Sequence, residues 1–162
     1  LIVLRQGVTL LAALGAARYV RPLPLVYGSS IGGHLRHIIE HYQSFVTGLE
    51  DGAFNYENRA RSPEIESSPE FASGILAAIA NRLGALGQEL AAQPIDYCVE
   101  TSPGERTPSS VLRELEFLLS HTVHHYALVA VMCLLQDFEP EKSFGIAPST
   151  LRYQQSLATC AR

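Results

Sequence analysis

The chain has 162 residues, of which 47% are hydrophobic and 17% are charged, and its net charge is −4 with a pI near 5.8. That length suits one domain with a single buried core, and the composition is typical of a soluble globular protein. Its 12 Lys and Arg residues form no run, which argues against a nucleic-acid-binding surface. No stretch reaches the ~18 uninterrupted apolar residues of a membrane span, which argues against a membrane partner.

The three cysteines are odd in number and match no metal-ligand spacing; they are Cys98, Cys133 and Cys160. An odd set without such spacing favours reduced thiols over a disulfide framework. We therefore expect one cytoplasmic domain over residues 1–162.

The first predicted element is an amphipathic helix over about residues 2–19, which ends before the two prolines of RPLPL. The stretch GVTLLAALGA also resembles the apolar core of a signal peptide. Because Arg5 and Gln6 split the apolar run, we expect a helix that is retained in the folded domain.

The second helix is predicted to open at SSIGGH, with Ser29 or Ser30 as its N-cap, and to end near Gly48. The polar stretch that follows is long for a connection, so it indicates a crossover between the second and third helices. The third helix is predicted to begin after a Ser68 cap, with a proline in its first turn, and to end before residue 94.

The segment 94–110 alternates briefly and contains a turn motif, which predicts a short hairpin. The fourth helix is predicted to begin after a cap at Ser109 or Ser110 and to end near Asp137. Four helices with little strand content predict an all-α protein, with a four-helix bundle as its architecture.

All six histidines lie in two blocks, HLRHIIEHY in the second helix and HTVHHY in the fourth. His121 and His125 are four residues apart, so they lie on one helix face and can both bind one metal ion. The first block also presents its three histidines, His34, His37 and His41, on one side of its helix. Three neutral imidazoles from two packed helices can hold a divalent first-row metal and leave coordination positions open.

Other interpretations of these residues are weaker. A single histidine on an apolar face is usually a hydrogen-bonded core residue, but two blocks that contain every histidine favour a metal site. Glu114, seven residues before His121, could orient a ligand histidine, or it could serve the first helical turn or solvent. The segments YGSS and SIGGH fit neither a phosphate-binding loop nor a nucleophile elbow.

The pair SIGGHLRHIIEHY and LLSHTVHHYALVAVMCLL resembles the DinB-like superfamily of DinB/YfiT-type metalloenzymes over essentially the whole chain. The resemblance implies a four-helix bundle with up-down-down-up topology and a long crossover between helices 2 and 3. It also implies a metal triad of one histidine on the second helix and an H-x-x-x-H pair on the last long helix. These positions fall on His37, His121 and His125, with His34 as the nearest rival of His37 and His41 as a weaker one.

The resemblance further implies an activity, since the superfamily includes thiol-dependent transferases, a mycothiol-dependent isomerase and the metal-binding domain of ergothioneine-forming enzymes. We expect a metal-dependent hydrolase or transferase of the thiol-dependent type. It would use Zn, Ni or Fe, a low-molecular-weight thiol and a small-molecule substrate, with His34 and His124 as candidate proton carriers. The alternatives are a non-catalytic metal-binding or stress-response protein on the same fold, and a plain helical bundle without metal.

The C-terminal tail, about 139–162, carries apolar residues in a short span: Phe144, Ile146, Leu151 and Tyr153. We expect such a tail to pack on the domain. A second hypothesis has it fold over the open end of the bundle near the metal, where Arg152 would bind an anionic substrate or a thiol carboxylate. A homodimer is one candidate assembly.

Overall fold

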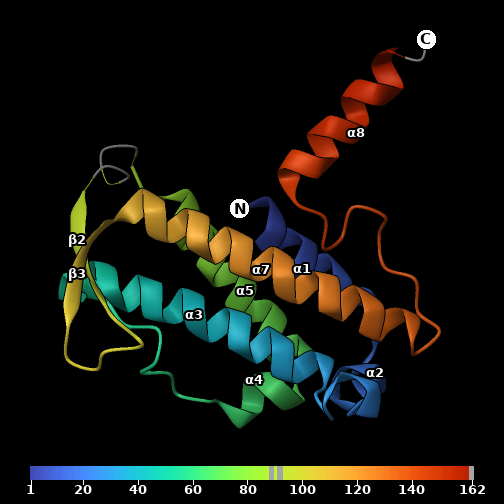
Figure 1. The fold of residues 1–162 in the computed structure, drawn as a ribbon. Coiled ribbons are helices and arrows are strands. Elements are labelled where there is room, and N and C mark those ends of the chain that lie inside the picture. The colour runs from blue at the N-terminus through green and yellow to red at the C-terminus, as the bar shows by residue number, and fades with distance from the viewer. Residues whose placement is uncertain (88–89, 91–92, 161–162) are drawn as a thin grey trace.

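The computed structural model describes residues 1–87, 90 and 93–160 and is mostly helical, with a small three-stranded sheet. Four helices that pack on one another form the body of the molecule: α1 (Ile2–Leu14), α3 (Ile31–Asp51), α5 (Pro69–Gly84) and α7 (Val111–Leu134) (Figure 1). Further helices lie between and after them: α2 (Ala16–Val20), a 3-10 turn (Pro24–Val26), α4 (Pro63–Ser67) and α8 (Pro148–Cys160).

The body is held together by apolar faces that these four helices turn toward one another. α1 packs mainly on α5, and α3 lies between α5 and α7. The side chains buried in the core come from all four helices and include Leu4, Leu14, Ile38, Phe45, Leu76, Leu118 and Met132. At the contact of α1 with α7, a Cβ atom on Gly7 would collide with the hydroxyl of the buried Tyr126, so this position requires glycine.

The predicted first helix is wrong in one respect, because it is not continuous to residue 19. α1 ends at Leu14, and Gly15 adopts a positive φ of 80° before α2 begins. Glycine reaches this region at no steric cost, so the chain turns at this point.

The N-caps settle the alternatives that the sequence left open. The Ser30 side chain accepts a hydrogen bond from the backbone N–H of Gly33, at 3.0 Å, and so caps α3. The Ser110 side chain accepts from the backbone N–H of Arg113, at 3.3 Å, and caps α7. Ser68 caps α5 as predicted, and these caps satisfy N–H groups that a helix start leaves unpaired.

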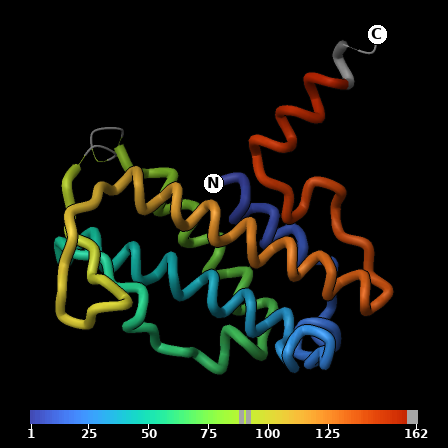
Figure 2. The backbone as a smooth tube through the Cα atoms, viewed as in Figure 1, coloured from blue at the N-terminus to red at the C-terminus, as the bar shows by residue number. Residues whose placement is uncertain are grey.

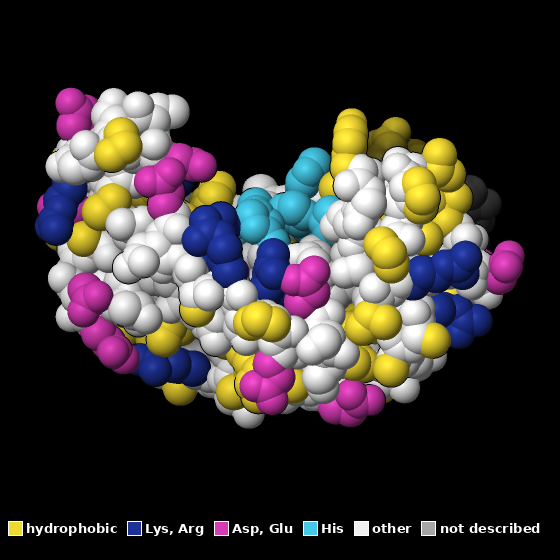
Figure 3. Space-filling view, turned by 90° about the horizontal axis from the view of Figure 1, so that it is seen from below, with side chains coloured by type: hydrophobic (Ala, Val, Ile, Leu, Met, Phe, Trp, Pro, Cys, Tyr) yellow, Lys and Arg dark blue, Asp and Glu magenta, His cyan; other side chains and the backbone are white. Residues whose placement is uncertain are grey.

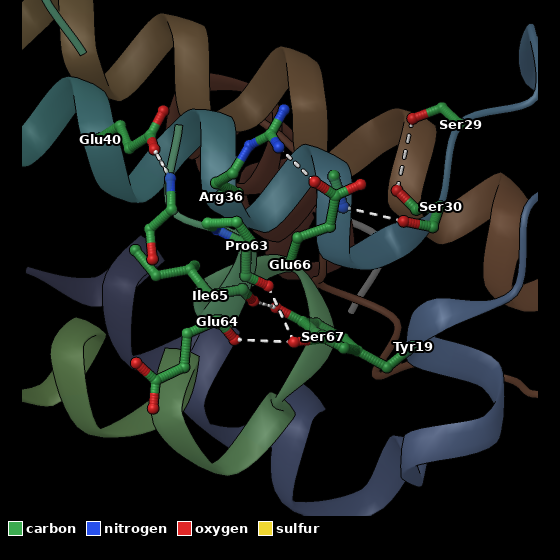
Figure 4. A network of polar contacts seen from close by, with 12 residues as sticks. Tyr19, Ser29, Ser30, Arg36, Glu40, Pro63, Glu64, Ile65, Glu66 and Ser67 are labelled. Atoms are coloured by element: carbon green, nitrogen blue, oxygen red, sulfur yellow. Dashed lines mark hydrogen bonds and ion pairs between the residues drawn. The ribbon is translucent and has the colours of Figure 1, made fainter. Parts of the chain in front are cut away.

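The connection from α3 to α5 is long, as expected, and it runs back along α3 (Figure 2). Two polar contacts attach it to α3, as Figure 4 shows: an ion pair of Arg36 with Glu66, and a hydrogen bond from the Ser62 backbone N–H to the Glu40 carboxylate at 2.7 Å. These contacts lie on either side of His37 in α3. They therefore hold the crossover beside that histidine.

The sheet lies at the end of the molecule where α3 ends and α7 begins (Figure 1). The predicted hairpin is confirmed: β2 (Pro94–Cys98) pairs antiparallel with β3 (Arg106–Ser110), with Asp96 opposite Pro108. A further strand, β1 (Ala53–Phe54), pairs parallel with β2 and was not predicted, because two residues carry no recognisable period.

Two helix ends differ from the prediction. α5 ends at Gly84 rather than just before residue 94, and residues 88–89 and 91–92 of the remaining stretch lie outside the described residues. α7 ends at Leu134, three residues before the expected Asp137.

The tail divides into a packed half and a projecting half. Phe144 is buried and its ring stacks on that of Tyr126, with 4.5 Å between centroids. The following segment forms α8, a helix that the sequence did not predict and that extends away from the body (Figures 1 and 2). Tyr153 on α8 is 63% exposed, so the expected packing of the tail ends before it.

By length and composition alone, α7 is apolar enough to cross a membrane. Such a helix is weak evidence of a span, because the core helices of globular proteins pass the same test. α7 also contributes Leu118, Tyr126 and Met132 to the buried core.

Candidate metal centre

The two histidine blocks meet where α3 and α7 lie side by side. Figure 3 shows histidine side chains gathered in a hollow of the surface, with basic side chains at its edge. His34 and His37 on α3, and His121 and His125 on α7, are each partly buried. The structure therefore places the histidines of α3 against those of α7, as the sequence predicted.

Three ring nitrogens converge at this contact. The Nε2 atom of His121 lies 3.1 Å from Nε2 of His37 and 3.2 Å from Nε2 of His125. One imidazole nitrogen carries either a proton or a lone pair, so Nε2 of His121 cannot form a good hydrogen bond to both neighbours. A tetrahedral zinc ion with Zn–N bonds of about 2.0–2.1 Å separates its ligands by about 3.3 Å. The spacing of His37, His121 and His125 thus fits the donor set of a metal ion.

The protonation state of the three rings also suits a metal. Burial, followed by the nearby imidazoles, lowers the pKa of His37 and of His121 to about 3. Burial and the neighbouring His34 and His124 lower the pKa of His125 to about 4. The rings are therefore neutral near pH 7, and neutral imidazole is the form that binds a metal.

His34 contacts the cluster through a different atom. Its Nδ1 lies 2.9 Å from Nδ1 of His125, while its own Nε2 is buried without a hydrogen-bond partner. If His125 directs Nε2 toward the shared centre, its Nδ1 carries the proton and donates to His34. The geometry therefore gives His34 the place of an orienting group beside His125.

His41 is engaged in structural contacts. Its Nδ1 donates to the backbone carbonyl of His37 at 2.7 Å, and its ring stacks on that of Tyr56. Its ring centroid lies 4.1 Å from that of His121. His41 thus supports two members of the cluster through packing and through the backbone.

His124 and Arg152 lie on another side of α7. His124 is exposed and lines a separate hollow with Arg152 at the start of α8. Arg152 does not line the hollow that contains His34, His37 and His125. The role of Arg152 in substrate binding stays a prediction, as does proton transfer by His124.

Glu114 does not contact a ligand histidine. Its fully buried carboxylate accepts hydrogen bonds from the hydroxyls of Tyr56, at 3.0 Å, and Ser109, at 2.6 Å, and it pairs with Arg113 at 3.0 Å. It lies in the first turn of α7, where a negative charge is favourable. This position agrees with the expected role of Glu114 in the first turn of the helix. It does not agree with a solvated carboxylate, because the side chain is fully buried.

Arg59 was not predicted as a site residue, because from the sequence the crossover that contains it is only a long polar connection. The crossover brings one terminal nitrogen of Arg59 to 3.0 Å from Nδ1 of His37. No periodic pattern in a loop could have indicated this contact.

An open side of the cluster faces a hollow of about 400 Å³, within the usual size range of small-molecule pockets. It is lined by residues of α3, α7 and the two connections beside α3, including Pro22, Ser29, Ser30, Arg36 and Glu66. A small molecule in this hollow would contact His34, His37 and His125.

The family model of the DinB superfamily matches residues 7–129. The chain belongs to the DinB superfamily. The part of this DinB-superfamily chain that matches contains all six histidines and ends within α7, before the tail and α8. Among curated proteins, none matches the chain.

Proposed function

We propose that this protein binds a divalent transition metal through His37, His121 and His125 and acts as a thiol-dependent transferase. The observation that supports the proposal most strongly is the convergence of three neutral Nε2 atoms at the spacing of metal ligands, beside an open hollow. The donor set of three imidazoles suits Zn, Ni or Fe.

The finer description of the fold belongs to the same proposal. α1 and α7 run in one direction and α3 and α5 in the other (Figure 1), which supports a four-helix bundle with up-down-down-up topology. In such a bundle, facing helices supply a site in the interior, as α3 and α7 would in this proposal.

The chain's own groups would bind and orient the reactants. When bound, a divalent cation would supply Lewis acidity that lowers the pKa of a coordinated thiol. His34 would fix the ring of His125, and the hollow lined by Ser29 and Ser30 would admit the small-molecule substrate. His34 would also be the proton carrier closest to the site.

The two cysteines whose side chains the structure describes, Cys98 and Cys133, support an external thiol. Burial raises the pKa of the Cys133 thiol to about 11, so it stays protonated and is a poor nucleophile near neutral pH. Cys98 lies in β2, apart from the hollow. A low-molecular-weight thiol is therefore the nucleophile that we propose, with the cytoplasm as the compartment that supplies it.

The proposal is tested with untagged protein loaded with Zn²⁺, Ni²⁺ or Fe²⁺ under anaerobic conditions. Each form is assayed for transfer of a low-molecular-weight thiol to an aromatic halide electrophile. We expect turnover that needs metal and thiol together and that is lost in His121→Ala. Full metal binding without turnover for any thiol and electrophile would remove the transferase and leave a metal-binding protein.

A further inference from the structure

Arg59 places a positive charge beside His37 and His41, and no carboxylate of the described residues forms an ion pair with it. One terminal nitrogen lies 3.0 Å from Nδ1 of His37 and 3.3 Å from both ring nitrogens of His41. Among the described residues, every ion pair within 4.0 Å involves another arginine. Glu40 lines the same surface hollow as Arg59, but its carboxylate accepts from the Ser62 backbone and forms no ion pair with Arg59.

The neighbours of Arg59 satisfy little of its hydrogen-bonding capacity. A guanidinium has five N–H donors and no acceptor. The Nε–H of Arg59 is buried without a partner. Nδ1 of His41 already donates to the carbonyl of His37, so of the two ring nitrogens of His41 only Nε2, at 3.3 Å, can accept from Arg59. A partly buried cation with unpaired donors is costly, and a bound anion would remove that cost.

The backbone around Arg59 is held in place for this role. The Glu40 contact to Ser62 and the Arg36–Glu66 ion pair attach the crossover to α3 on either side of His37 (Figure 4). The guanidinium is thus presented to His37 by a fixed segment. A fixed cation binds an anion with less loss of conformational entropy than a mobile one.

The other arginines near the three histidines are less suitable for binding an anion. Arg36 lines the hollow at the cluster, but its charge is neutralised by Glu66. Arg152 lies in the separate hollow with His124. Arg59 is therefore the cation that combines contact with a cluster histidine and the absence of a carboxylate partner.

We propose that Arg59 and the Nδ1–H of His37 together bind an anionic oxygen group, a carboxylate or a phosphate, of the substrate or its thiol. His37 can bind a metal through Nε2 only if its proton is on Nδ1, and that N–H then faces the guanidinium of Arg59. Two facing donors repel each other, and an anionic oxygen between them accepts from both. This substrate class rests on the proposed metal site, because it uses the Nδ1–H tautomer of His37.

The experiment measures anion affinity and metal content separately. Zn²⁺-loaded and metal-free proteins are titrated calorimetrically with inorganic phosphate and with acetate at low ionic strength. The variants are Arg59→Ala and Arg59→Lys, with the exposed Arg106→Ala as the matched control. Circular dichroism verifies that each variant is folded. If Arg59→Ala does not fold, the anion affinity of Arg59→Lys is compared with that of the wild type instead.

We expect Arg59→Ala to retain the metal content of the wild type and to lose about tenfold or more in affinity for the preferred anion, as a charge-assisted hydrogen bond predicts. Arg59→Lys should lose less affinity, and Arg106→Ala should match the wild type. The tighter probe identifies the group as phosphate or carboxylate. The proposal is overturned if the wild type binds neither probe, if Arg59→Ala binds both with unchanged affinity, or if Arg106→Ala loses as much affinity as Arg59→Ala.

Failure of the metal site gives a different result. If the wild type binds no metal but its binding of phosphate or acetate still depends on Arg59, the proposed function is contradicted and the anion site is retained. If the wild type binds metal but its anion affinity does not change in Arg59→Ala, only the anion site is contradicted.

Discussion

The Nδ1 atoms of His34 and His125 lie 2.9 Å apart, across the contact between α3 and α7. Only one of them can carry a proton in a hydrogen bond between neutral rings. If His125 uses Nε2 toward the shared centre, His34 must accept at Nδ1. His34 thus has a role that differs from that of a metal ligand.

This contact predicts a graded effect of substitution. His34→Ala should keep the metal stoichiometry but weaken metal affinity about tenfold to a hundredfold, which is the usual effect of removing a partner that orients a ligand. Competition with a chromophoric chelator measures the affinity. His124→Ala is the control, because His124 is exposed, and should match the wild type. Equal affinity in His34→Ala and wild type would contradict the role of His34.

The lowered pKa values predict how the metal-free protein responds to acid. The pKa values of His37 and His121 are about 3 and that of His125 is about 4 in the folded chain, against about 6.5 for an unperturbed histidine. Between about pH 6.5 and pH 4 the unfolded chain therefore binds protons that the folded chain does not. The free energy of unfolding should fall as the pH falls through this window.

Urea unfolding of the metal-free protein from pH 7.5 to pH 4 tests this prediction. Carboxylates also titrate near the acid end, so the comparison is with a His121→Gln, His125→Gln double variant. That variant should show a shallower dependence between pH 6.5 and pH 5. If the free energy of unfolding depended on pH equally in both proteins, the imidazoles would not be the cause of that dependence.

The buried carboxylate of Glu114 predicts a stability effect at the start of α7. Tyr56→Phe removes a hydroxyl that donates to Glu114 at 3.0 Å, and it should lower the free energy of unfolding by about 1–3 kcal/mol. Tyr27→Phe is the control, since that side chain is fully exposed. Chemical denaturation of both variants measures the difference. A Tyr56→Phe protein as stable as the control would show that the remaining partners suffice.

Two glycines within helices should respond to alanine in opposite ways. A Cβ atom at Gly7 would collide with the Tyr126 hydroxyl and crowd Leu76, so Gly7→Ala should destabilise the protein by about 1–3 kcal/mol. A Cβ atom at Gly74 in α5 meets nothing within 4 Å, so Gly74→Ala should stabilise by about 0.5–1 kcal/mol. Thermal unfolding of both variants tests the packing of α1 on α7. A stabilising Gly7→Ala would mean that this packing is wrong.

Local pattern explains what the sequence could predict. The i, i+4 spacing of His121 and His125 places both on one helix face whatever the tertiary structure, and serine caps mark the starts of α3, α5 and α7. The separation of His34 from His37 depends on how α3 faces α7. Spacing along one helix does not encode that.

Other features lacked a pattern or had one that was overlooked. The break at Gly15 is hidden, because a single glycine in an apolar run is compatible with a continuous helix. The place of Arg59 depends on contacts that attach a loop to α3. α8 did have a recognisable start in Pro148, which lies at its first position.

The central claim is that His37, His121 and His125 hold one transition-metal ion. Elemental analysis of the protein purified without a histidine tag tests it most directly, alongside His37→Ala, His121→Ala, His125→Ala and His34→Ala. We predict about one ion per chain in the wild type and in His34→Ala, abolished binding in His121→Ala and His125→Ala, and severe weakening in His37→Ala. A wild type without metal, or a His37→Ala protein that keeps its metal while His34→Ala loses it, would contradict the account.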